Sequence, residues 1–227
     1  MPTADPVAER AADAARTVVE RLLSLAAPPA CFGCGGPSRP GDPLCPGCRR
    51  RLRWLGPDPV DCGGLPVWAP LAYEGAARAL VAALKFRGAL GLAETMAAQM
   101  AAGVPATFLL GASLVPVPLH PARSRRRGFN QAERLAASLG RRIGLPLADC
   151  LERGGPASRQ TGRSRRERIA GPASSIGVRG GSAAPARAVL VDDVVTTGST
   201  LRACAVALRS AGSAEVRAVT YARTPGR

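Results

Sequence analysis

The sequence predicts an α/β protein in which helices flank a parallel sheet, with a small cysteine-rich module ahead of it. Residues 189–201 have the pattern of a short apolar strand, two adjacent acids, a loop of hydroxyl residues around one glycine, and the start of a helix. From residue 107 onward, strand-like and helix-like patterns alternate, which is typical of a parallel sheet covered by helices. Near the N-terminus, four cysteines form two closely spaced pairs.

The order of these patterns divides the 227 residues into four expected parts. They are an N-terminal helix at 1–27, which either docks or frays, a four-cysteine module at 28–56, a linker and helical, hood-like segment at 57–105, and an α/β core at 106–227. Hydrophobic spacing predicts helices at 76–86, 90–102, 130–143 and 201–211, and strands at 67–73, 114–117, 188–191 and 216–221.

The loop after the predicted strand at 188–191 has the chemistry of a phosphate site. Its hydroxyl groups are hydrogen-bond donors, and its glycine allows the backbone to bend closely around a ligand. The helix that follows adds backbone N–H groups and the positive end of its dipole. The residues of this hydroxyl loop are Thr196, Thr197, Gly198, Ser199 and Thr200.

Two acids, Asp192 and Asp193, precede the hydroxyl loop. We expect them at the carboxyl end of a strand, where open α/β sheets bind ligands. Carboxylates beside a phosphate cradle repel the phosphate itself. They suit sugar hydroxyls or a metal ion that the ligand carries.

The cysteine pairs have the spacing of a metal site. Cys31 and Cys34 form one Cys-x-x-Cys pair, and Cys45 and Cys48 form the other. Four thiolates favour tetrahedral zinc, and a site with four protein ligands has no open position for catalysis, so we expect a structural role. An iron–sulfur site on the same ligands stays open, whereas a disulfide would need an oxidising compartment. The other cysteines, which we expect to act as buried small apolar residues, are Cys62, Cys150 and Cys204.

Positive charge is concentrated in the middle of the chain. The formal net charge is +15, and residues 121–187 contain 15 arginines against four acids, a net charge of +11. A compositional bias explains why arginine replaces lysine, but not why the arginines gather in this segment. We therefore favour an anionic partner, either pyrophosphate or a similar small polyanion, or a single-stranded nucleic acid. No apolar run reaches transmembrane length, so we expect a soluble, cytoplasmic protein.

Two residues are singular in this chain. Lys85, at the end of a predicted helix, is the only lysine. His120 is the only histidine, so a Ser-His-Asp triad could form only around this residue. A compact ammonium acts as a point charge on phosphate, so Lys85 is expected either to reach a phosphate site or to be a solvated cation at a helix end.

The run from Asp192 through the hydroxyl loop resembles the 5-phosphoribosyl-1-pyrophosphate (PRPP) motif of type I phosphoribosyltransferases. This resemblance implies that the hydroxyl loop holds the 5-phosphate and that Asp192 and Asp193, the expected catalytic pair, hold the ribose hydroxyls. It also implies a loop after the first core strand that grips pyrophosphate, and a flexible basic loop at 159–168, which by charge alone equally fits a disordered tract. The residues expected on pyrophosphate, together with magnesium, are Lys85, Arg123, Arg127, Arg165 and Arg166.

Further motifs resemble the ComF family, phosphoribosyltransferase-like proteins linked to competence for DNA uptake. They are the four-cysteine module, the stretches 116–121 and 127–131, the stretches 160–162 and 165–168, and 84–88. The resemblance implies a type I phosphoribosyltransferase-like fold and PRPP as ligand. It leaves the acceptor open and makes competence proteins candidate partners. A glycosyl-transfer enzyme is favoured over its rivals, a PRPP sensor or nucleic-acid-handling protein without catalysis and a scaffold.

Overall fold

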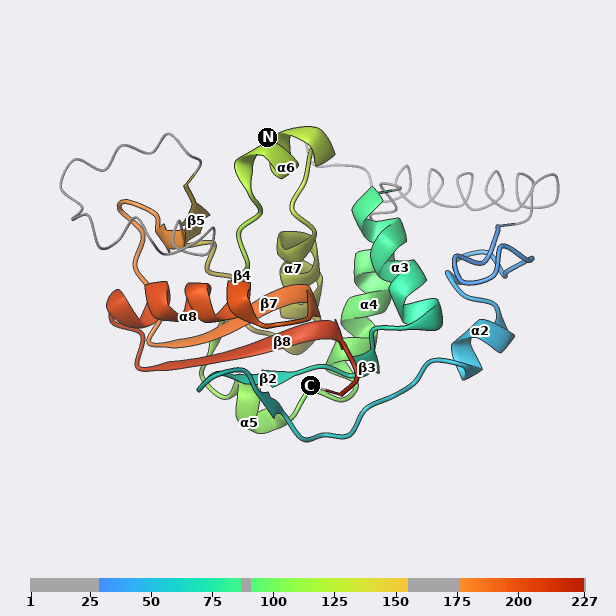
Figure 1. Ribbon diagram of the computed structural model, residues 1–227, viewed down its shortest axis with the longest axis horizontal. Coiled ribbons are helices and arrows are strands. Elements are labelled where there is room, and N and C mark those ends of the chain that lie inside the picture. The colour runs from blue at the N-terminus through green and yellow to red at the C-terminus, as the bar shows by residue number, and fades with distance from the viewer. Residues whose placement is uncertain (1–28, 87–90, 155–175, 227) are drawn as a thin grey trace, which may run out of the picture. The chain divides into compact units, whose positions relative to one another are not determined.

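The computed structural model describes residues 29–86, 91–154 and 176–226 (Figure 1). The chain forms two compact units, Met1–Arg51 and Leu52–Arg227. The predicted N-terminal helix and the basic loop at 159–168 lie outside the described residues. In the described part, no helix combines the length and apolar character needed to cross a bilayer.

The first unit contains one short helix, α2 (Pro46–Arg50), and a bridge between Ala30 and Pro37. Pro46 occupies the first turn, where its missing N–H costs nothing. Cys45 caps the helix, because its sulfur accepts a hydrogen bond from the N–H of Cys48. The cysteine pairs thus determine the local backbone.

The second unit is built on a six-stranded sheet with the order β1-β2-β8-β7-β4, in which β3 also pairs with β8. All pairings are parallel except that of β1 with β2. The strands are β1 (Val60–Asp61), β2 (Pro66–Trp68), β3 (Leu71–Ala72), β4 (Ser113–Pro116), β7 (Arg187–Val195) and β8 (Glu215–Arg223). The strand expected at 67–73 is therefore two short strands, since Pro70 has no N–H to pair.

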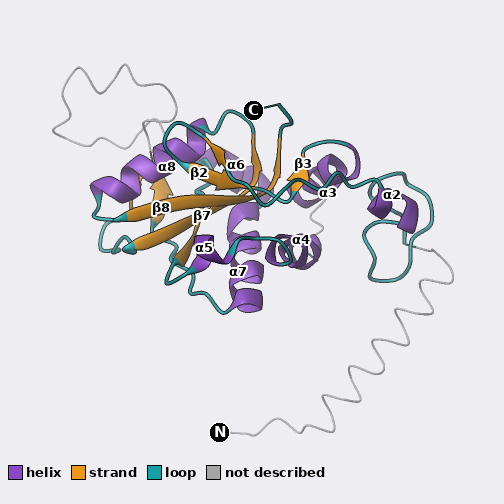
Figure 2. Cartoon of the chain, turned by 90° about the horizontal axis from the view of Figure 1, so that it is seen from below, coloured by secondary structure: helices purple, strands orange, loops and turns teal. Residues whose placement is uncertain are grey.

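Helices cover both faces of this sheet (Figure 2). Helix α8 packs on one face, where Leu190 of β7 joins Cys204 and Leu208 in a buried cluster. Helices α4 and α7 lie on the other face with fully buried apolar side chains. The helices of this unit are α3 (Gly75–Phe86), α4 (Leu92–Ala101), α5 (Ala106–Leu109), α6 (Pro121–Arg127), α7 (Gln131–Ile143) and α8 (Ser199–Ser210).

Helix α3 carries Lys85 to the sheet. Its first two turns are rich in alanine, the best helix former, and its apolar stripe buries Leu80, Val81 and Leu84 completely. Burial of three such side chains contributes about 1.5–3 kcal/mol each, which fixes the helix against the core. Lys85 follows Leu84 in the last turn, so its position is set by this packing.

An antiparallel ribbon, β5 (Leu151–Arg153) with β6 (Ile176–Val178), contacts α8. The sequence did not predict this ribbon, because each strand has only three residues and their partner lies more than twenty residues away in the chain.

Candidate functional site

Three chain segments meet at the carboxyl edge of the sheet. Pro116 of β4 pairs with Val191 of β7, and Val191 pairs with Val219 of β8, so these parallel strands end on the same side. The segment leading to α6 follows β4, the hydroxyl loop follows β7, and Thr224 follows β8. Since β7 lies between β4 and β8, the hydroxyl loop lies between the segment that follows β4 and the segment that follows β8.

The hydroxyl loop turns directly into α8. Gly198 is the N-cap residue with φ of 71°, a left-handed conformation that favours glycine. A side chain there would also collide with Cys62, because an added Cβ would lie 2.9 Å from the Cys62 Cβ. No side chain caps this helix and its first turn has no acid, so its N-terminus is suited to an anion. Thr197 and Ser199 are exposed there, with their hydroxyl oxygens 3.2 Å apart.

The two acids lie within β7, which continues to Val195, and not at its end. Neighbouring side chains of a strand point to opposite faces. The Oδ1 atom of Asp193 lies 2.8 Å from the Nζ atom of Lys85. Burial, and after it the charge of Asp192, raises the pKa of Cys204 in α8. Asp192 and Asp193 therefore lie on opposite faces of β7.

Asp193 is almost completely buried, with 3% of its side chain exposed. Burial raises its pKa, while the ammonium of Lys85 and the guanidinium of Arg127 oppose this rise. Its Oδ1 atom pairs with Lys85, but its Oδ2 atom has no hydrogen-bond partner among the described residues. A buried oxygen without a partner costs stability, so a ligand that binds it gains affinity.

Asp192 titrates near neutrality. Burial raises its pKa to about 7, and the neighbouring charge of Asp193 adds to this. Its Oδ1 atom accepts a hydrogen bond of 2.8 Å from the backbone N–H of Asp193, which partly offsets the rise.

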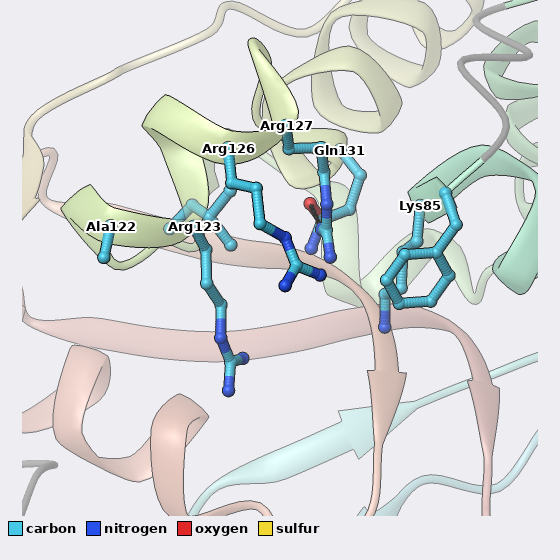
Figure 3. A pocket seen from close by; sticks show the side chains of 8 residues that line it. Lys85, Ala122, Arg123, Arg126, Arg127 and Gln131 are labelled. Carbon is cyan, nitrogen blue, oxygen red and sulfur yellow. Dashed lines mark hydrogen bonds between the residues drawn. The ribbon is translucent and has the colours of Figure 1, made fainter.

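A cavity of about 580 Å³ lies between the end of α3 and α6, where Lys85 pairs with Asp193. Its wall carries four cations, and Figure 3 shows Arg123, Arg126 and Arg127 extending from α6 into the same space, with Lys85 on the opposite side. Arg127 donates a hydrogen bond of 2.6 Å to Gln131 and lies 5.2 Å above the Phe86 ring. We call this the cationic pocket; its lining residues are Lys85, Phe86, Leu119, Ala122, Arg123, Arg126, Arg127 and Gln131.

The segment after Pro121, expected as a loop, is the helix α6. Pro121 is its first residue, His120 caps it by accepting the Ala122 N–H at Nδ1, and Gly128 ends it with φ of 78°. These signals were present in the sequence, but an all-polar run gives no apolar periodicity to reveal a helix. The helix explains why Arg126 joins the pocket: Arg123, Arg126 and Arg127 have the spacing of one helix face.

The structure thus brings together Lys85, Arg123 and Arg127 of the five residues expected on pyrophosphate. Arg165 and Arg166 lie outside the described residues. The sequence did not indicate Arg126, Phe86 or Gln131 as pocket residues. Arg126 could have been included, because it belongs to the same run of arginines as Arg127.

The four cysteines of the first unit form one cluster. Their sulfur atoms all lie within 4.8 Å of one another, and those of Cys34 and Cys45 are 3.8 Å apart. Tetrahedral zinc with metal–sulfur bonds of about 2.3 Å has sulfur–sulfur edges of about 3.8 Å, so the cluster can hold such an ion. Although burial opposes ionisation of Cys31, hydrogen bonds from the N–H groups of Cys45, Cys34 and Gly33 lower its pKa to about 6. Burial raises the pKa of Cys48 to about 12.

Comparisons with known proteins give one matching family and several similar proteins. Residues 125–227 match the phosphoribosyl transferase domain family. Competence protein F of Haemophilus influenzae is 37% identical over 114 residues, 49% of this chain and 50% of that protein. ComFC of Streptococcus pneumoniae is 31% identical over 109 residues (48% and 47%), and ComFC of Bacillus subtilis is 35% identical over 101 residues (44% and 40%). The chain spans about half the length of the curated relatives it matches, and both the predicted fold class and the family resemblance are confirmed.

Proposed function

We propose that this chain, which contains a phosphoribosyl transferase domain and is similar to the competence proteins F and ComFC, binds PRPP with magnesium and transfers its phosphoribosyl group to an acceptor. The observation that carries the proposal is the cationic pocket beside Asp193. Four cations surround a cavity of about 580 Å³, which suits a small polyanion.

In this proposal, each part of PRPP is assigned to one segment of this edge. The hydroxyl loop and the N-terminus of α8 would hold the 5-phosphate, and Asp192 and Asp193 would approach the ribose. The cationic pocket would receive pyrophosphate, because arginines bind pairs of phosphate oxygens and Lys85 adds a point charge. Each end of PRPP is anionic, and each of these two segments favours anions.

Magnesium fits this edge as a companion of pyrophosphate. Proteins hold Mg²⁺ through one or two carboxylates together with phosphate oxygens of the substrate. Asp193 offers such a carboxylate, since its Oδ2 atom is buried and has no partner among the described residues. Asp193 would hold the ion, which supplies positive charge to the departing pyrophosphate.

The chemistry requires no protein nucleophile. When pyrophosphate leaves C1, positive charge develops on the ribose and negative charge on the leaving group. Carboxylates near the ribose and cations near pyrophosphate stabilise these charges, and a rigid site pays no cost of reorganisation during the reaction. The arrangement of Asp193 against Lys85 and α6 has this polarity.

Calorimetric titration of the full chain with PRPP and magnesium tests the binding. Replacing both acids (Asp192→Asn with Asp193→Asn) should weaken PRPP binding by about tenfold or more, because hydrogen bonds to charged groups are lost. Circular dichroism must show an intact fold. Arg142→Gln, at an exposed residue of α7 away from the cationic pocket, is the matched control. Unchanged affinity in the double variant would refute the assignment.

A second function, PRPP sensing or handling of single-stranded nucleic acid without transfer, is favoured by one observation. Phe86 is 66% exposed beside Arg127, and an exposed aromatic ring near arginines can stack a base. Fluorescence titration with a labelled oligonucleotide at several salt concentrations tests it, since phosphate contacts give a steep salt dependence. In this second function, the chain would act together with competence proteins during DNA uptake.

For the first unit, we propose that Cys31, Cys34, Cys45 and Cys48 bind one structural zinc ion. The close sulfur cluster and the backbone N–H groups directed at Cys31 support this. Elemental analysis of reduced protein tests it and separates zinc from iron.

A further inference from the structure

One uncharged polar side chain, that of Gln131, lies in the wall of the cationic pocket. The other described lining residues are the four cations and the apolar residues Phe86, Leu119 and Ala122. Gln131 is only 6% exposed. Glutamine is rarely buried to this degree, and buried polar groups are nearly always hydrogen-bonded. Each donor and acceptor of this side chain should therefore have a partner.

The backbone at Gln131 is fixed to the central strands of the sheet. Asn130 caps α7 by accepting the Ala132 N–H at 3.1 Å, and its amide donates to the Val117 carbonyl, also at 3.1 Å. The N–H of Val117 in turn donates to the Val191 carbonyl of β7 at 3.0 Å. Gln131 is the first residue of α7, so this anchor sets the point from which its side chain extends.

The oxygen of the Gln131 amide is directed at Arg127. Its Oε1 atom accepts the hydrogen bond of 2.6 Å from Nη1 of Arg127. A guanidinium has donors only, so the amide nitrogen cannot take the place of this oxygen. The guanidinium also lies 5.2 Å above the Phe86 ring, and Figure 3 shows Arg127 and Gln131 next to each other in the pocket wall. Arg127 is thus held from two directions, and its remaining N–H groups are left for a ligand.

The nitrogen of the same amide has no acceptor among the described residues. The bond to Arg127 is the only hydrogen bond of the Gln131 side chain within the described part of the chain. Its Nε2 group therefore keeps two N–H donors at the wall of the pocket. The neighbouring guanidinium polarises the amide, which strengthens these donors. A donor in so buried a position costs stability, so a ligand that accepts its hydrogen bond gains affinity.

Glutamine at this position leaves the charge of the pocket intact. A glutamate would have the same length and could accept the same hydrogen bond, but its negative charge would offset one of the four cations. Both of its oxygens would also be acceptors, and they would repel phosphate oxygens. Gln131 holds Arg127 without this loss. The pocket thus offers an anion a hydrogen bond from a neutral amide in addition to those from its cations.

Given the proposed function, on which this step rests, we infer that Gln131 is a further ligand of pyrophosphate in the cationic pocket. Its Nε2 group donates a hydrogen bond to one phosphate oxygen, while its Oε1 atom holds Arg127 for another. One side chain therefore both binds the leaving group and positions a cation on it. Because negative charge grows on pyrophosphate as the C1–O bond breaks, this donor stabilises the transition state more than it stabilises bound PRPP.

Calorimetric titration of the full chain with inorganic pyrophosphate and magnesium tests this role. Gln131→Met keeps the length of the side chain but has no amide, and it should weaken pyrophosphate binding about tenfold or more. Gln131→Glu keeps the bond to Arg127 but loses the donor, and it should weaken binding at least as much. The matched control is Gln99→Met in α4, where the glutamine accepts a hydrogen bond of 2.7 Å from the Tyr221 hydroxyl and does not line the pocket. This control should change pyrophosphate affinity less than about twofold.

A second pair of variants separates a ligand from a residue that acts through Arg127 alone. In an Arg127→Met chain, Gln131→Met should still weaken pyrophosphate binding about threefold or more. No further loss in that chain would overturn the ligand role, since Gln131 would then only position Arg127. Unchanged affinity in Gln131→Met or in Gln131→Glu of the otherwise unaltered chain would overturn it as well. Absence of pyrophosphate binding by the unaltered chain overturns the proposed function, and the ligand role with it.

Discussion

Lys85 shows how a single residue joins separate parts of the chain. Its ammonium lies 2.8 Å from Asp193, although the two residues are 108 positions apart, and it also lines the cationic pocket. The sequence allowed both a solvated helix-end cation and a pocket residue. The structure shows a side chain only 23% exposed, because the apolar residues of α3 bury the face beside it.

We predict that Lys85→Arg weakens PRPP binding about tenfold although the positive charge is kept. The guanidinium is planar and longer than the ammonium, so it cannot contact Asp193 and a phosphate from the same position. Calorimetry on the full chain measures this. Equal affinity in Lys85→Arg and the unaltered chain would show that Lys85 acts as a surface charge.

The raised pKa of Asp192 predicts a pH-dependent stability. The folded pKa is about 7, above the ordinary value of 3.8 that we expect in the unfolded chain, so the folded state holds this proton more tightly. Its contribution to stability is complete below pH 3.8 and is lost as the pH rises through 7, by up to about 4 kcal/mol.

Asp192→Asn should therefore be more stable than the unaltered chain at pH 8, and the difference should shrink toward pH 4.5. Urea unfolding at both pH values, without ligand or metal, gives the two free energies. An equal difference at the two pH values would contradict the raised pKa.

Among elements, those with an apolar stripe were predictable and those without one were not. Helix α7 begins at Gln131 with Asn130 as its cap and ends at Ile143, close to the predicted helix at 130–143, because Leu135 and Leu139 mark a buried face. Residue chemistry indicated the hydroxyl loop, and hydrophobic spacing predicted the helix that follows it. Helix α6 and the cationic pocket were not predicted, since a pocket depends on how α3 and α6 lie across a sheet that only the fold assembles.

Gly128 should control the order of α6. Its φ of 78° is costly for a residue with a Cβ, by roughly 1–2 kcal/mol, which is large for a helix of seven residues. Gly128→Ala should fray α6, spread its arginines and weaken pyrophosphate binding severalfold by calorimetry. Gly91→Ala is the matched control, because Gly91 has φ of −60° and no atom lies within 4 Å of an added Cβ. Equal pyrophosphate affinity in both variants would show that α6 does not depend on this glycine.

At the scale of the whole molecule, the two compact units rely on different sources of stability. The unit Leu52–Arg227 has a sheet with helices on both faces and many fully buried apolar side chains. Among the described residues of the first unit, 29–51, the buried ones are two cysteines, Cys31 and Cys48, and one leucine, Leu44. A core this small does not offset the entropy of ordering the chain, so the metal that we propose would supply the difference.

Removing that metal should therefore affect one unit alone. Chelation under reducing conditions should raise amide hydrogen exchange across residues 29–51 toward the unprotected rate, while protection in β7 and β8 and the affinity for PRPP stay unchanged. Cys34→Ser should have the same effect and lower the metal content below one ion per chain. Cys62→Ser, at a cysteine outside the cluster, should keep one ion. Loss of protection in β7 on chelation would mean that the second unit also depends on the metal, and full protection of 29–51 without metal would show that the cysteine module folds unaided.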